Sequence, residues 1–279
     1  MIAGLFRLHL VAVAGLSAAV FGYLFAGQFL LPAAAIAALD WGLAGLWNRG
    51  SDLREDALNQ VEGTQLLVRS GREFSRLALG VLSLSIFAAL RLGWPLLAMR
   101  LAFHAGAFIY SYPILRRRLK EVLLVKNVFA GLLWVLSSVG YPLALSRRVP
   151  LVPEVALLSL FLLPLAVSYT LVYDLRDLKG DAAAGIATVP IALGVPRTRV
   201  LIELILALSA LALLAGHLWG VLRFAELVML AAPLQLALVL RFWLAREPGR
   251  HGVEAMTWLS AGQLLSYLAW ASTGFPLPH

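Results

Sequence analysis

The chain contains no cysteine among its 279 residues. This absence excludes disulfide bonds and thiolate chemistry, although it says nothing about the redox compartment. Charge is also scarce, because only 14% of residues are Asp, Glu, Lys or Arg while 61% are hydrophobic. A soluble globular domain carries about 25% charged residues, so the composition excludes an ordinary soluble protein.

Long apolar runs fill most of the sequence, and the mean hydropathy is +0.85. Several runs reach the roughly 20 residues needed to cross a bilayer. Because little basic charge precedes the first run and no small-residue cleavage site follows it, we expect a retained helix there rather than a signal peptide. The sequence predicts an all-α polytopic membrane protein of about nine spans, at 9–28, 29–47, 74–92, 94–112, 122–145, 152–173, 198–217, 222–244 and 253–273.

Basic residues outnumber acidic ones by 23 to 15, and the net charge is +8. With nine spans, the polar loops 48–73, 113–121, 174–197 and 246–252 fall on one side of the membrane and hold most of the Arg and Lys. Basic loops face the cytoplasm, so the C-terminus is expected outside. The charge then indicates contact with anionic lipid and no nucleic-acid partner. We expect the cytoplasmic membrane of a prokaryote.

The few acidic residues gather in two places. "NRGSDLREDALN" begins at residue 48 and holds Asp52 and Asp56, and "YDLRDLKGDAAAGIATVP" begins at residue 173 and holds Asp174, Asp177 and Asp181. Each stretch contains a DxxxD spacing, and each follows an even-numbered span. This recurrence suggests a single domain, 1–279, built of two similar four-helix halves, 9–121 and 122–244, plus a ninth helix at 253–273.

Carboxylates four residues apart on a helix share a face and could share a divalent cation. Mg²⁺ commonly takes one or two carboxylates together with substrate phosphates, so two facing pairs would suit a diphosphate. Charged loops at a membrane face are more often simply solvated. The paired occurrence favours a ligand site, as do the small residues that follow Asp181, which let the backbone approach a ligand closely.

These motifs resemble those of the UbiA superfamily of intramembrane prenyltransferases. The second stretch is similar to that family's second aspartate motif, and Asn48, Asp52 and Asp56 match its NDxxDxxxD motif in register. "RSGR" at 69–72 and the basic stretch 110–127 also resemble family segments. The resemblance covers nearly the whole chain.

The resemblance implies a helical bundle around a central cavity that the aspartate motifs cap. It implies Mg²⁺-dependent transfer of a polyprenyl group from a polyprenyl diphosphate to a small-molecule acceptor, usually aromatic, within the membrane. Asp52, Asp56, Asp177 and Asp181 would be the catalytic Mg²⁺ ligands, with Asp174 a further metal ligand and Asn48 in support. Arg69 is the first candidate to bind the diphosphate, followed by Arg116, Arg118, Lys120 and Lys126, and Tyr169 and Tyr173 would line the cavity.

Arg49 departs from the pattern, because the family usually has Asp there and an arginine cannot ligate Mg²⁺. We expect Arg49 to contact the diphosphate directly, with an altered substrate, a slower enzyme or lost activity as alternatives. A second register, with Glu55 as the replacement acid, is the weaker option, because it weakens the last ligand and loses the match of Asn59 to a position where many family members have Asn.

Asp40 is an acid inside a span, which marks a site by default. We expect it either to face the cavity and bind the acceptor or to pair with Arg100 or His104. Two other functions stay open for the whole chain. One is a membrane terpene cyclase that uses the same aspartates, and the other is a non-catalytic transport or lipid-binding bundle.

Overall fold

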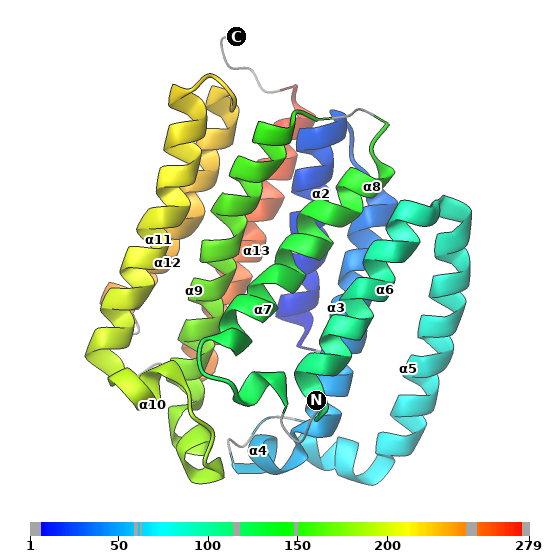
Figure 1. Ribbon diagram of the computed structural model, residues 1–279, viewed down its shortest axis with the longest axis vertical. Coiled ribbons are helices and arrows are strands. Elements are labelled where there is room, and N and C mark those ends of the chain that lie inside the picture. Colours follow the sequence, from blue (N-terminus) through cyan, green and yellow to red (C-terminus); the bar gives the residue numbers. More distant parts are fainter. Residues whose placement is uncertain are drawn as a thin grey trace.

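The computed structural model describes residues 7–58, 61, 63–113, 118–147, 150–243 and 250–274. Within these residues there is no β-strand, and the helices run roughly side by side in one bundle (Figure 1). The all-α prediction is confirmed. The longer helical segments are α2 (Leu8–Ala26), α3 (Leu31–Ser51), α5 (Thr64–Leu92), α6 (Trp94–Ser111), α7 (Val125–Val135), η2 (Leu136–Gly140) with α8 (Tyr141–Leu145), α9 (Val152–Ala184), α11 (Val195–Leu218), η3 (Phe224–Leu230) with α12 (Ala231–Leu238) and η4 (Val239–Trp243), and α13 (Arg250–Ser272).

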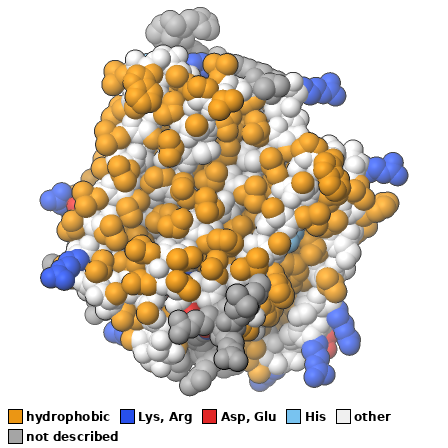
Figure 2. Space-filling model, in the orientation of Figure 1, with side chains coloured by type: hydrophobic (Ala, Val, Ile, Leu, Met, Phe, Trp, Pro, Cys, Tyr) orange, Lys and Arg blue, Asp and Glu red, His pale blue; other side chains and the backbone are white. Residues whose placement is uncertain are grey.

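Six helical segments are long and apolar enough to cross a membrane: α2, α5, α7 to α8, α9, α11 and η3 to η4. The expected spans 29–47, 94–112 and 253–273 coincide with the helices α3, α6 and α13. The exact number of nine crossings therefore stays a prediction. Hydrophobic side chains cover the middle of the visible face, while Lys and Arg lie mostly toward its edges (Figure 2). The chain is an integral, multi-pass membrane protein.

Local sequence explains where α2 ends, where α3 begins and why a later span is irregular. Gly27 caps α2 with φ of +67°, a left-handed conformation that glycine adopts without strain. Pro32 lies in the first turn of α3, where a missing amide proton costs least. The π turn of η2 ends two residues before Pro142, so the span from α7 to α8 is irregular close to the proline.

Helix packing brings the two acidic motifs together. α2 packs against α3 and α13, and α9 packs against α7 and α11. The short helix α4 (Leu53–Leu58) carries Asp56 and contacts α9, which carries the second motif. α4 and the short helix α10 (Val189–Leu193) lie at the same end of the bundle (Figure 1). Each motif therefore caps that end beside the other.

Two predicted polar loops are largely helical, and this is a correction. Residues 174–184 continue α9, which ends only where Gly185 takes φ of +72°. Residues 64–73 belong to α5, with non-helical backbone at Ser70. Of the loop 113–121, residues 114–117 lie outside the described residues, and so does most of the loop 246–252. Local polarity led to the loop interpretation, but the helix hydrogen bonds continue past the apolar run.

Candidate active site

A cavity of about 1440 Å³ opens inside the bundle beneath the acidic motifs. Its polar end is lined by all five motif carboxylates, Asp52, Asp56, Asp174, Asp177 and Asp181, together with Asn48, Lys120 and Lys126. The structure thus gathers most of the predicted site residues from α3, α4, η1 (Leu119–Glu121), α7 and α9.

The second motif lies on consecutive turns of α9. Asp174 Oδ1 is 2.8 Å from Lys126 Nζ, and Asn127 Nδ2 donates to its Oδ2 at 2.9 Å. Asp177 accepts from Nε and Nη2 of its neighbour Arg176 at 2.7 and 2.6 Å. The Asp177 side chain keeps 27% of its surface exposed, more than Asp174 at 10%. Asp177 is therefore the better placed of the two to meet a ligand.

The first motif is enclosed by basic side chains. Asp52 is in contact with Nζ of Lys120, and Arg118 Nη1 is 3.3 Å from its Oδ1. Asn48 Nδ2 donates to its Oδ2 at 2.9 Å. Burial lowers the pKa of Lys120 to about 7. An anion bound beside Lys120 would favour its charged form.

Arg49 lies elsewhere than predicted. It is fully buried and does not line the cavity. Its Nε is 3.3 Å from Asp56 Oδ2, and its Nη2 donates to Thr64 Oγ1 at 3.4 Å. The sequence-based expectation that Arg49 reaches into the substrate space is not supported by this geometry. Its charge instead pairs with one of the motif carboxylates.

Two other predicted residues stand apart from the cavity lining, and a third lies outside the described residues. Arg69 is exposed on α5, although the sequence ranked it first for the diphosphate. Arg118 acts through its pairs with Asp52 and Glu121 and does not line the cavity. Arg116 falls outside the described residues.

Asp40 forms a buried ion pair with Arg100 and does not line the cavity. Arg100 donates to both of its oxygens, at 2.9 Å from Nε and 2.5 Å from Nη2. His104 Nε2 lies 3.0 Å from Oδ1, and Tyr141 donates to Oδ2 at 2.8 Å. Asp40 and Arg100 are both fully buried, and neither lines the cavity. Of the two alternatives from the sequence, the geometry favours the pair.

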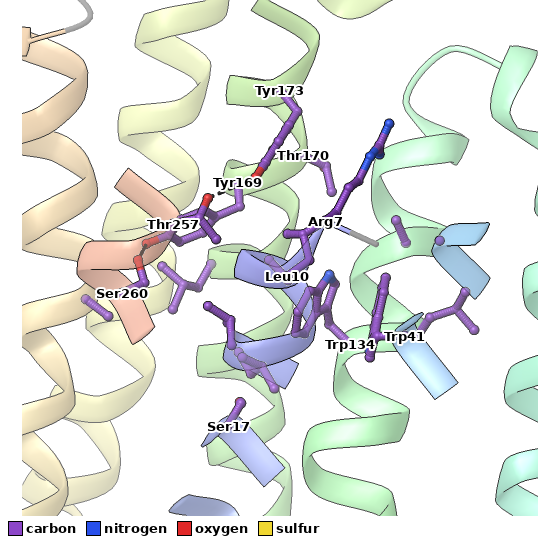
Figure 3. Close-up of a pocket in the computed structure, with 18 of the residues that line it drawn as sticks. Arg7, Leu10, Ser17, Trp41, Trp134, Tyr169, Thr170, Tyr173, Thr257 and Ser260 are labelled. Carbon is purple, nitrogen blue, oxygen red and sulfur yellow. Dashed lines mark hydrogen bonds between the residues drawn. The ribbon is translucent and has the colours of Figure 1, made fainter. Parts of the chain in front are cut away.

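The deeper part of the cavity is apolar and aromatic. Trp41 and Trp134 stack with ring centroids 4.1 Å apart, and Trp41 Nε1 donates to Ser137 at 2.9 Å. Tyr169 and Tyr173 lie one turn apart on α9 and point to α13, where they hydrogen-bond to Ser260 and Thr257 (Figure 3). These bonds fix both rings at the cavity wall, as the sequence predicts for the two tyrosines.

Several cavity residues were missed by sequence reasoning. Arg7 comes from the start of α2 and points among the cavity residues, with Nη2 3.8 Å from Asp56 Oδ1 (Figure 3). Asn127 and Arg176 hold Asp174 and Asp177. Asn127 follows Lys126 in the basic stretch and Arg176 lies within the second motif, so the sequence could have identified both as candidates. Arg7 carries no motif, because only the fold brings it to Asp56.

The donor set suits Mg²⁺ at the second motif better than at the first. Among the described residues, no three acidic or histidine side chains converge as a ready-made metal cluster. Mg²⁺ does not require one, since it is often held by one or two carboxylates plus substrate phosphates and water. Asp177 and Asp181, four apart on α9 and both at the cavity, provide such a pair. Asp56 in the first motif is paired with Arg49, which does not line the cavity, whereas Arg176, the partner of Asp177, does line it.

Comparisons with known proteins agree with this architecture. A UbiA homolog from Archaeoglobus fulgidus, solved bound to GPP and Mg²⁺, is similar with a TM-score of 0.73 and 15% identity over 99% of each chain. The same homolog bound to Cd²⁺ gives a TM-score of 0.68 and 17% identity, over 96% of this chain and 98% of that one. The structure reported for digeranylgeranylglyceryl phosphate synthase has a TM-score of 0.64 and 16% identity, over 99% and 98% of the chains.

At these identities, the solved structures show a shared fold. No curated protein matches the chain. The model of the UbiA prenyltransferase family matches residues 8–270, almost the entire sequence. The fold, the two acidic motifs and this match lead to one conclusion, that the chain belongs to the UbiA prenyltransferase family.

Proposed function

We propose that this protein transfers a prenyl group from a prenyl diphosphate to a small acceptor inside the membrane, with Mg²⁺ as cofactor. The observation that carries the proposal is the two-part cavity, with five aspartates and several basic residues at one end and an apolar, aromatic interior beyond. A prenyl diphosphate also has two parts, a charged diphosphate that would fit the polar end and a hydrocarbon chain that would fit the apolar interior. The solved relatives bound to GPP or DMAPP with Mg²⁺ support this choice of donor.

The polar end would bind the diphosphate and favour its departure. Asp177 and Asp181 would hold Mg²⁺, which supplies charge neutralisation as the carbon–oxygen bond breaks. Lys126, Lys120 and Arg7 line the same end and would place positive charge on the diphosphate oxygens. The bond's electron pair leaves with the diphosphate, and the prenyl group becomes an allylic cation.

The interior would protect that cation. Water would quench it, and the apolar lining between α2, α9 and α13 leaves little polar surface to hold water. The faces of Trp41, Trp134 and Tyr169 present electron-rich surfaces that attract positive charge. The acceptor's nucleophilic atom then bonds to the cation and loses its proton. We propose an aromatic acceptor, since stacked rings at the wall suit a flat substrate.

The test is a product assay on the purified protein in lipid. It is incubated with geranyl, farnesyl or geranylgeranyl diphosphate, Mg²⁺ and a panel of aromatic and glycerol phosphate acceptors, and products are read by mass spectrometry. The expected result is a prenylated acceptor that disappears with EDTA. The control is the same reaction mixture without any acceptor.

The outcomes separate the candidate functions. A prenylated glycerol phosphate would retain the transferase and overturn the aromatic acceptor. A hydrocarbon or alcohol formed without acceptor would indicate a terpene cyclase. No product from any donor, although the donor binds, would favour a non-catalytic lipid-binding bundle.

A further inference from the structure

We propose that the first acidic motif of this chain uses basic side chains in place of a divalent cation, so that the loaded enzyme binds one Mg²⁺, at Asp177 and Asp181. This inference rests on the proposed prenyltransferase function. It concerns only how the charge of the diphosphate is balanced. It replaces the sequence-based expectation that both aspartate pairs are metal sites.

The first observation is the pairing of Asp56. Arg49 approaches Asp56 Oδ2 from inside the protein, with Nε at 3.3 Å, and Arg7 approaches Oδ1 with Nη2 at 3.8 Å. The Arg49 side chain has no exposed surface, so it cannot swing into water to make room. A divalent cation on Asp56 would face a fixed guanidinium of the same sign. Displacing Arg49 would leave its charge buried without a partner, which is strongly unfavourable.

The second observation is that Asp52 is equally engaged. Its Oδ1 is contacted by Lys120 and lies 3.3 Å from Arg118 Nη1. Its Oδ2 accepts from Asn48 Nδ2 at 2.9 Å. Both oxygens therefore already accept from donors, and the side chain is only 11% exposed. Mg²⁺ demands near-ideal octahedral geometry and would have to replace several of these contacts at once.

The second motif differs in the way that the inference requires. Asp177 is paired with Arg176, the adjacent residue on the helix, and its side chain is 27% exposed compared with 8% for Asp56. Arg176 donates to both oxygens of Asp177, but this guanidinium itself lines the cavity, where a bound diphosphate would compete for it, whereas Arg49 does not line the cavity. Asp181, one turn further, lines the same cavity.

A direct contact between protein and diphosphate follows from this arrangement. Lys120 and Arg7 both line the cavity and both touch a first-motif carboxylate. Both side chains therefore bring positive charge to the polar end of the cavity, where a phosphate oxygen would bind. Arg49 and Arg118 do not line the cavity, and we assign them the role of positioning residues that hold Asp56 and Asp52 in place.

The test counts bound metal directly. The purified protein in lipid is saturated with geranyl S-thiolodiphosphate, an unreactive donor analogue, and Mn²⁺ is titrated in place of Mg²⁺ while free Mn²⁺ is followed by electron paramagnetic resonance. We expect one Mn²⁺ per chain in the wild type and none in Asp177→Asn. Arg49→Asp should gain a second Mn²⁺, whereas Arg49→Lys, the matched control that keeps the charge, should still bind one.

The possible results are distinct. Two Mn²⁺ per wild-type chain, with the analogue bound, would overturn the inference and leave the prenyltransferase function standing. No binding of the analogue at any Mn²⁺ concentration would overturn both. If Arg49→Asp does not fold, the wild-type count and Arg49→Lys still decide, since two Mn²⁺ in either would overturn the inference.

Discussion

At the scale of single residues, the second acidic motif is expected to carry the metal-dependent step. Asp177→Asn or Asp181→Asn should lower turnover by roughly two orders of magnitude or more, because lost metal binding removes several kcal/mol of charge stabilisation from the departing diphosphate. Turnover is measured by product formation in lipid. The matched control is Glu73→Gln, which neutralises an exposed carboxylate on α5 away from the cavity. Full activity of both aspartate variants, or of the wild type in EDTA, would contradict the mechanism.

The ion pair of Asp40 and Arg100 is expected to act on stability. Asp40→Ala leaves a fully buried guanidinium without its carboxylate, which costs about 3–5 kcal/mol in comparable pairs. Thermal unfolding in detergent should therefore shift clearly downward. The double variant Asp40→Leu with Arg100→Met should recover most of the loss, because replacing both partners removes the uncompensated charge. A double variant as unstable as Asp40→Ala would show that the pair is not the cause.

Asp40 also shows what sequence could not decide. An acid inside a span must be either paired or at a site, and the sequence left both options open, with Arg100 and His104 as the possible partners. The choice depends on how α3 is rotated relative to α6, which the sequence alone does not give. Arg49 is similar, since its chemistry was read correctly as incompatible with Mg²⁺ but its direction was not.

At the scale of elements, α7 and α9 must approach closely to form the site. Gly131 lies where they meet, and a Cβ there would be 3.0 Å from Leu163 Cδ1 and Val167 Cγ2. α7 carries Lys126 and Asn127, which hold Asp174 on α9. Any separation of these helices would therefore also disturb the second acidic motif.

Gly131→Leu is expected to destabilise the protein by about 1–3 kcal/mol through overpacking and to lower activity with it. Thermal unfolding and product formation would be measured together. Gly80→Leu is the matched control, because Gly80 is exposed on α5 with nothing within 4 Å of a new Cβ. Equal effects of the two substitutions would mean that helix packing at Gly131 is not critical.

The elements themselves were predictable where one physical signal dominated. Apolar runs of bilayer length located the helices, and the expected spans 9–28 and 29–47 placed the break between α2 and α3 correctly to within a few residues. The start of α5 and the end of α9 were not predicted, because polar residues outside a bilayer can be helical or irregular. Arg69 was misjudged for the same reason. In a loop, Arg69 could reach a ligand, whereas on α5 its side chain is exposed and does not line the cavity.

At the scale of the whole molecule, membrane orientation is a prediction of charge alone. The basic residues around α4, η1 and the end of α9 gather at one end of the bundle, and α13 ends at the opposite end (Figure 1). Basic segments stay on the cytoplasmic side during insertion. We therefore expect the acidic motifs at the cytoplasmic face and Ser272 at the outer face. The diphosphate group would then enter the cavity from the cytoplasm.

The lack of cysteine makes this orientation directly testable, since any introduced thiol is the only one in the chain. Arg72→Cys places it at the exposed start of α5, and Ser272→Cys places it at the exposed end of α13. In intact cells, a membrane-impermeant maleimide should label Ser272→Cys at once and Arg72→Cys only after lysis. Labelling both in lysed cells controls for accessibility. The reverse pattern in intact cells would invert the topology and put the diphosphate end of the cavity on the outer face.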